Sequence, residues 1–291
     1  MNLSYDKVLY TGPMEYALLK DGKAIGKDGK ELGKEKSLAN RWSFNPKVFE
    51  KNKEILTKVR HGQFNPDQWL MGSYDGQYSS QSDTSYGGIY DYYAYLTDRY
   101  GTGWSLLYSG NVTSIYPNLM TDYDPPGTNN CVLTALTTIF EHWRYQGYTN
   151  IPSSTYTIYN DVKTIATNNY GYTSTGGVAW SHIGYLALDL WDYYNYPAGS
   201  AYDDAVVTWG KITNEVNYNR PPILSLTGGY YNNHSITVVG YKEYQRYWYD
   251  DNVEFINVYD GWDRATRYID WDVMQWGGEA IFLGLTMNIH P

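Results

Sequence analysis

The sequence contains a single cysteine, Cys131, among its 291 residues. An intramolecular disulfide is therefore excluded. Uninterrupted apolar stretches of about 18 residues are also missing, so the sequence predicts no membrane-spanning helix. No group of His, Cys and Asp has the spacing of metal ligands, and we expect neither a metal site nor another cofactor.

Acidic residues outnumber basic ones: the chain has 31 Asp and Glu but 22 Lys and Arg, which gives a net charge of −9. Nucleic acid is therefore not expected as the main partner. The charge is uneven: residues 1–60 carry 13 basic against 8 acidic side chains, whereas residues 61–291 carry 9 against 23. A basic front on an acidic body predicts either a segment that docks on the rest of the chain or an ordinary solvated face.

The first residues, MNLSYDKVLYTG, lack the apolar core of a signal peptide. Two explanations are open, an intracellular protein or an exported one whose signal has been removed. Lysine is scarce while tyrosine and glycine are abundant, a composition more typical of exported proteins. We therefore expect a secreted or cell-surface protein.

Residues 1–110 are expected to form an N-terminal accessory region or pro-segment. Two Lys-Asp-Gly-Lys stretches within residues 1–40 favour tight turns, which predicts short hairpins or an exposed arm. An Asn-Pro pair and a later Gly mark the two ends of an amphipathic helix at about 46–60. The Gly/Ser/Tyr-rich stretch at about 71–88 has no periodicity and is expected to be a polar linker.

Residues 111–291 change from helical to extended periodicity along the chain. After Cys131, apolar residues recur at helical spacing, which predicts a helix with one strongly buried face. Further helices are expected near 179–194 and 203–217, the second capped by Asp203 or Asp204. Five later stretches have the pattern of strands: 223–226, 235–241, 254–259, 266–271 and 280–287. Helices first and strands afterwards predict an α+β domain.

Cys131 is expected at the first turn of its helix. The positive end of the helix dipole favours a thiolate and lowers the pKa of such a thiol. A thiolate is a strong nucleophile that works best beside a base, which later serves as the acid for the leaving group. The position therefore suggests a nucleophile, although a lone buried cysteine is more often a small core residue.

Of the five histidines, His234 has the position expected of that base. It ends the Gly-rich turn TGGYYNN and opens an apolar strand, so sheet pairing would hold it at the edge of a cleft. His61 and His142 lie near predicted helix ends, where solvated or capping roles are expected. His182 lies in a predicted helix, where a structural role is expected, and His290 is next to the C-terminus.

Asp260 ends a later predicted strand and is followed by Gly261 and Trp262. A carboxylate there can accept a hydrogen bond from one imidazole nitrogen and orient the ring. Trp262 can shield that hydrogen bond from water and so strengthen it. The conjunction predicts a triad of Cys131, His234 and Asp260.

These motifs resemble the papain-like fold of cysteine peptidases. NNCVLTALTTIFEHW is similar to the nucleophile helix of streptopain-like and bacteriocin-processing (C39-like) bacterial peptidases. PPILSLTGGYYNNHSITVVGY is similar to their strand, glycine turn and His-bearing strand, and DGW stands where they have Asn-x-Trp or Asp-x-Trp. The resemblance covers roughly residues 115–290. It implies a papain-like catalytic domain over 111–291, with a helical half that carries the Cys followed by an antiparallel β-sheet half that carries the His and Asp.

The resemblance also implies a function, the hydrolysis of peptide bonds in a peptide or protein substrate. Cys131 would be the nucleophile, His234 the general base and then the acid, and Asp260 the orienting residue. The reaction would pass through a thioester acyl-enzyme.

One expected residue is missing from the site. Such enzymes usually place a Gln before the Cys to donate into the oxyanion hole, and the preceding segment contains none. Asn129 or Asn130 is the candidate replacement, although either can instead cap the helix. The turn before His234 is expected to border the substrate cleft through Gly228, Gly229, Tyr230 and Tyr231.

Two other functions are compatible with the sequence. A papain fold that lacks an oxyanion donor can serve as a catalytically weak or inactive binding protein. A related cysteine amidase or acyltransferase acting on cell-wall peptides would use the same residue types.

Overall fold

The computed structural model describes four strands within residues 7–34 and then residues 88–291 without 229, 232, 248–250 and 277–279. The chain divides into two compact units, Met1–Phe49 and Glu50–Pro291. The helix expected at about 46–60 lies outside the described residues, as does the linker expected at about 71–88 except for Gly88.

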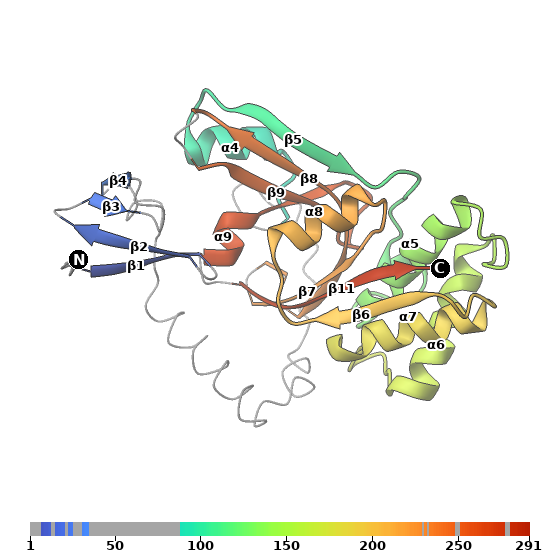
Figure 1. Cartoon of the computed structure of the whole chain (residues 1–291). Coiled ribbons are helices and arrows are strands. Elements are labelled where there is room, and N and C mark those ends of the chain that lie inside the picture. The colour runs from blue at the N-terminus through green and yellow to red at the C-terminus, as the bar shows by residue number, and fades with distance from the viewer. Residues whose placement is uncertain are drawn as a thin grey trace. The chain divides into compact units, whose positions relative to one another are not determined.

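The first unit contains an antiparallel sheet with the order β1-β2-β3-β4 (Figure 1). Its strands are β1 (Lys7–Gly12), β2 (Glu15–Lys20), β3 (Lys23–Ile25) and β4 (Glu31–Lys34). Lys20 pairs with Lys23 across an Asp-Gly dipeptide, and the β3–β4 connection contains the second Asp-Gly. Asp-Gly suits such connections because both residues tolerate positive φ angles. The expected short hairpins are confirmed.

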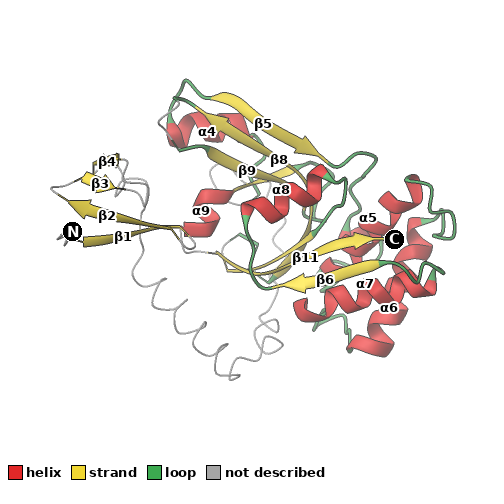
Figure 2. Cartoon of the chain, viewed as in Figure 1, coloured by secondary structure: helices red, strands yellow, loops and turns green. Residues whose placement is uncertain are grey.

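The second unit combines helices with one large sheet. Three of its helices, α5, α6 and α7, lie together on one side of the unit, and the strands lie beside them (Figure 2). The described helices are α4 (Tyr92–Tyr100), α5 (Cys131–Tyr145), α6 (Thr155–Tyr170), α7 (Ile183–Tyr193), α8 (Trp209–Asn217) and α9 (Trp271–Trp276). None of the helices in the described part of the chain is long and apolar enough to cross a membrane.

The sheet of the second unit is antiparallel throughout, with the order β10-β9-β8-β7-β11-β6. The long strand β8 pairs with β9 along one edge; on the other edge, β7 pairs with its first half and β5 with its second half. The strands are β5 (Ser105–Asn111), β6 (Ser200–Asp204), β7 (Ile223–Gly228), β8 (His234–Gln245), β9 (Val253–Tyr259), β10 (Arg267–Asp270) and β11 (Ala280–His290). The predicted α+β class is confirmed, as are the five predicted strands.

The helix predicted at 203–217 is wrong in its first half. Asp203 and Asp204 belong to β6, where they pair with β11, and neither caps α8. The helix begins only at Trp209, and Thr208 caps it by accepting a hydrogen bond from the Lys211 backbone.

The predicted domain boundary at 110/111 falls inside β5. That strand pairs with β8, and the buried side chains of α4 pack with Tyr244 and Phe255 of the same sheet. Residues 88–110 are therefore an integral part of the second unit.

Candidate active site

Cys131 is the first residue of α5, and the preceding segment holds it there. The buried Asn130 donates from Nδ2 to the Met120 carbonyl oxygen (3.0 Å) and to the Tyr159 hydroxyl (2.9 Å). The Asn129 backbone N–H donates to the Ser174 carbonyl oxygen (2.8 Å). The thiol is therefore fixed at the helix N-terminus, as the sequence predicted.

His234 opens β8 and pairs with Leu226 of β7. Its imidazole is buried and lies nearly parallel to the Trp262 ring, with 4.5 Å between the ring centroids. On another side it stacks with Tyr231 at 5.9 Å. Two aromatic rings thus restrict the orientation of the imidazole.

Asp260 meets His234 through its main chain. Nε2 of His234 lies 2.6 Å from the Asp260 carbonyl oxygen. The buried carboxylate instead accepts from the Trp262 backbone N–H (2.9 Å) and from the Tyr231 hydroxyl (3.1 Å). The sequence predicted that the Asp260 carboxylate would contact the imidazole. In the structure the main-chain carbonyl oxygen of Asp260 makes that contact.

Gly261 allows the segment after Asp260 to approach the helical half. Its φ is +78°, and a Cβ there would lie 3.2 Å from Met120 Cγ. The Met120 N–H also donates to the Gly261 carbonyl oxygen at 2.8 Å. A glycine is required because the backbone is left-handed and the space is tight.

The three segments meet around Cys131. The backbone N–H of Ser235, the residue after His234, acts to lower the pKa of the Cys131 thiol. Cys131, Ser235 and Asp260 also line one small cavity of about 10 Å³. That volume suits about one water molecule, so a peptide would have to reach the thiol from outside this cavity.

Burial has the largest effect on the pKa values of Cys131, His234 and Asp260. It raises the pKa of the Cys131 thiol, against which the backbone N–H groups of Ser235, Val132 and Cys131 act. It lowers the pKa of His234 to about 4 and raises the pKa of Asp260 to about 6. Burial thus favours a neutral Cys131 thiol and a neutral His234 imidazole, whereas the helix dipole alone predicted a thiolate.

The thiol should therefore alkylate slowly near neutral pH. Because burial disfavours the thiolate, we expect the iodoacetamide rate of the folded protein to rise with an inflection above the value of about 8.5 for a free cysteine. The urea-unfolded chain, with the same single thiol, is the control. An inflection below 8.5 in the folded protein would instead reveal a thiolate–imidazolium pair.

Asn129, Asn130 and Tyr231, which the sequence placed in the oxyanion hole or the substrate cleft, have other contacts in the structure. Both amide hydrogens of Asn130 are used on Met120 and Tyr159, and the Asn129 amide donates to the Thr175 carbonyl oxygen. The Asn130 amide therefore has no hydrogen left for an oxyanion, whereas the Asn129 bond uses one of its two amide hydrogens. Tyr231 is fully buried rather than exposed in a cleft, and its hydroxyl bond to Asp260 was not foreseen.

The turn before His234 is described in part. Tyr230 is half-buried and lies against Trp262, with ring centroids 5.6 Å apart. Gly228 ends β7 and pairs with Ala280, whereas Gly229 lies outside the described residues.

Two other histidines have structural roles. His142 is fully buried, and its Nε2 lies 3.1 Å from the Asn219 carbonyl oxygen, so the expected solvated role is wrong. His182 precedes α7 and packs against Tyr170 at 5.7 Å. In the part of the chain that the structure describes, no group of three or more His, Cys, Asp or Glu side chains could hold a metal ion.

The fold and the site define an α+β protein in which a cysteine-bearing helix packs against an antiparallel sheet. The chain belongs to the Peptidase_C39 like family, whose model matches residues 114–275. The resemblance inferred from the sequence is thereby confirmed, and membership suggests cysteine peptidase activity. A search of curated proteins found no match to the chain.

Proposed function

We propose that the protein is a cysteine peptidase that hydrolyses peptide bonds through Cys131, His234 and Asp260. The supporting observation is that Cys131 at the start of α5, Ser235 near the start of β8 and Asp260 line one small cavity. His234 precedes Ser235, and Asp260 holds its ring. The proposed triad thus combines a thiol, an imidazole and a carboxyl group from segments that are far apart in the sequence.

The reaction follows from which ring nitrogen is held. Asp260 engages Nε2, so Nδ1 takes the thiol proton as the sulfur attacks the scissile carbonyl carbon. The imidazolium then returns that proton to the leaving amine, and a thioester remains on Cys131. Water, deprotonated by His234, attacks the thioester and releases the carboxylic acid, and the thiol recovers its proton.

The oxyanion in this mechanism has one donor from the helix start. The first N–H groups of a helix have no intrahelical partner, so the Cys131 backbone N–H is oriented to donate. Both amide hydrogens of Asn130 and one of the two amide hydrogens of Asn129 are committed to other acceptors. Loss of one oxyanion donor typically costs about 10²–10³ in rate, so we expect a slow peptidase.

Asp260→Asn should lower kcat/KM by less than about tenfold, because the main-chain carbonyl oxygen that meets His234 is unchanged. The Asn side-chain oxygen can also still accept from the Trp262 N–H. Initial rates on fluorescently labelled casein, with the unfolding temperature measured in parallel, test this expectation.

An orienting carboxylate would behave differently. Its replacement by an amide costs about 10⁴-fold in the Ser-His-Asp enzymes. A loss of that size in Asp260→Asn, at an unchanged unfolding temperature, would show that the carboxylate and not the carbonyl orients the imidazole.

A second candidate function is a catalytically weak or inactive binding protein with the same fold. The binding protein is favoured by the raised pKa of Cys131 and by the commitment of both amide hydrogens of Asn130. Labelling with an irreversible cysteine-protease inhibitor, followed by mass spectrometry, separates the two. An adduct on Cys131 supports the peptidase, whereas an unlabelled thiol that still reacts with iodoacetamide supports the binding protein.

A further inference from the structure

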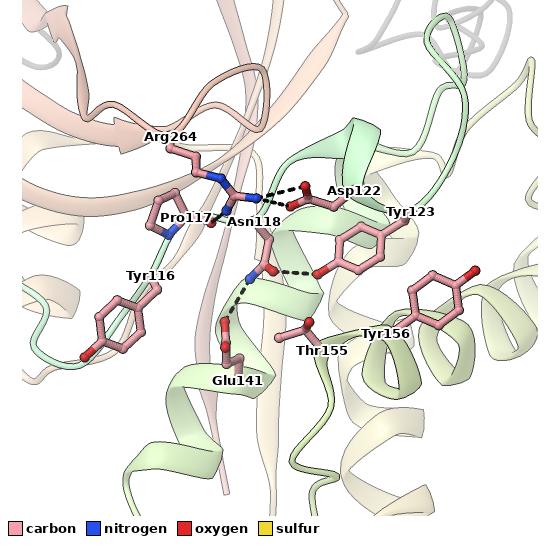
Figure 3. Close-up of a pocket in the computed structure, with 9 residues that line it drawn as sticks. All are labelled: Tyr116, Pro117, Asn118, Asp122, Tyr123, Glu141, Thr155, Tyr156 and Arg264. Carbon is pink, nitrogen blue, oxygen red and sulfur yellow. Dashed lines mark hydrogen bonds and ion pairs between the residues drawn. The ribbon is translucent and has the colours of Figure 1, made fainter.

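A groove lies beside α5, next to the candidate active site (Figure 3). Asn118 lines both this groove and the small cavity at Cys131. The groove encloses about 410 Å³, and its walls are Tyr116, Pro117, Asn118, Asp122, Tyr123, Glu141, Thr155, Tyr156 and Arg264.

The groove follows α5 away from the thiol. Asn118 Nδ2 donates to Thr138 Oγ1 (3.3 Å) and to Glu141 Oε2 (2.9 Å), two and three turns along the helix from Cys131. Ten residues of helix span about 15 Å. An extended peptide covers about 3.3 Å per residue, so Glu141 lies about four residues from a peptide bond held at Cys131.

Arg264, the one basic residue among the described residues that line the groove, already forms an ion pair. Arg264 donates to both carboxylate oxygens of Asp122, at 2.9 and 3.0 Å, and to the Pro117 carbonyl oxygen at 3.0 Å (Figure 3). It is therefore a poor partner for an acidic ligand.

Glu141 is the acid without a cation. Its carboxylate accepts from Asn118 and from the Tyr145 hydroxyl (3.3 Å), and no Lys or Arg among the described side chains forms an ion pair with it. Burial raises its pKa, an effect that the Asn118 and Tyr145 hydrogen bonds oppose. A cation in the groove would likewise stabilise the charged form of Glu141, which burial disfavours.

Two exposed tyrosines flank this carboxylate. Tyr116 is 55% exposed and Tyr156 is 56% exposed, and both rings line the groove (Figure 3). A long basic side chain can lay its methylene stem on such rings and place its charged end near a carboxylate. Acidic and small apolar residues would gain neither contact.

We propose that this groove is a subsite for a Lys or Arg of the peptide substrate, three to five residues from the bond that is cleaved. The proposal rests on the peptidase function of Cys131, which sets the distance to the cleaved bond. Glu141 is the residue that selects the basic side chain.

A decapeptide library incubated with the full-length protein tests the subsite, with the cleavage sites mapped by mass spectrometry. We expect Lys and Arg to be enriched roughly fivefold or more at one position three to five residues from the cut, about 1 kcal/mol of preference. Glu141→Gln should abolish the enrichment. Asp192→Asn, an exposed acid on α7 far along the chain, should retain it. Cleavage without basic enrichment, or enrichment that survives Glu141→Gln, would overturn the subsite.

Binding separates the subsite from the reaction. Fluorescein-labelled octapeptide pools, with either Lys or norleucine at one fixed position and neutral residues elsewhere, are titrated into full-length Cys131→Ala protein and followed by anisotropy. Tighter binding of the Lys pool, lost in Cys131→Ala with Glu141→Gln, supports the subsite even if no peptide is cleaved, in which case only the peptidase function fails. Equal binding of the two pools overturns the subsite.

Discussion

Cys131→Ala is expected to lower the hydrolysis of labelled casein by about 10⁴-fold or more, and His234→Ala by a similar factor. Nucleophile and base act as a unit, so removing either leaves only the binding and oxyanion contributions. For the same reason the double variant should be no slower than each single variant. Initial rates measure the loss, and circular dichroism checks that each variant is folded.

His290→Ala is the matched control for the base. His290 ends β11, where its Nδ1 contacts only the neighbouring Pro291 carbonyl oxygen among the hydrogen bonds of the described residues. We expect the activity of His290→Ala to equal that of the unchanged protein. Full activity in His234→Ala would show that another base serves Cys131, and His182 would be the next histidine to replace.

The positions of the site residues could be predicted because each is marked by local sequence. A helix period that begins at Cys131, and an apolar strand that begins at His234, locate two functional groups at the ends of elements. The Asp-Gly-Trp run marks a tight approach of backbone, which the positive φ of Gly261 explains. Such signals depend only on neighbouring residues.

The atoms that make the contacts could not be predicted in the same way. The Asp260 carbonyl oxygen meets the imidazole because its carboxylate is taken by Tyr231 and Trp262. Asn130 turns into the fold because α6 presents the Tyr159 hydroxyl. These choices are made by partners from other elements, and the sequence near Asp260 or Asn130 does not record them.

α6 and β5 are two elements that the sequence analysis did not predict. One has signals in its local sequence, and the other depends on a distant strand. α6 has local signals, because Ser154 caps it and Gly171 ends it in the left-handed region. β5 has none, since most of its side chains are exposed and do not alternate, and it exists through pairing with β8. The burial of His142 has the same kind of distant cause, because its ring contacts carbonyl oxygens at positions 114 and 219.

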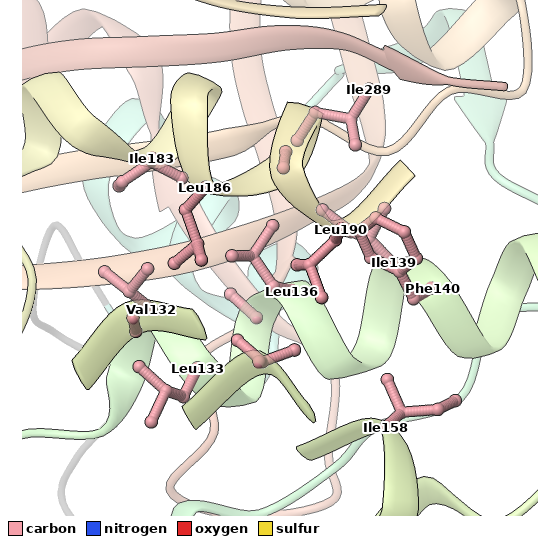
Figure 4. Close-up of a cluster of buried hydrophobic side chains, with 14 of the residues drawn as sticks. Val132, Leu133, Leu136, Ile139, Phe140, Ile158, Ile183, Leu186, Leu190 and Ile289 are labelled. Atoms are coloured by element: carbon pink, nitrogen blue, oxygen red, sulfur yellow. The ribbon is translucent and has the colours of Figure 1, made fainter. Parts of the chain in front are cut away.

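The second large effect concerns the helix that carries the thiol. Phe140 is fully buried on α5, among the apolar side chains of α6 and α7 (Figure 4). Its ring lies 4.4 Å from that of Trp191 and 5.7 Å from that of Tyr194. Phe140→Ala should therefore lower the free energy of unfolding by about 3–5 kcal/mol, through lost burial and the cavity left behind. For a unit of this size the unfolding temperature would fall by roughly 6–20 °C.

Tyr145→Ala is the control on the same helix, since it removes an aromatic ring that is 56% exposed. Substitutions at such surface positions usually change the free energy of unfolding by about 0.5 kcal/mol or less. Differential scanning calorimetry of both variants gives the comparison. Equal shifts in the two variants would mean that the α5–α7 contact contributes little to stability. A large shift in Phe140→Ala alone would show that the buried face of α5 stabilises the unit.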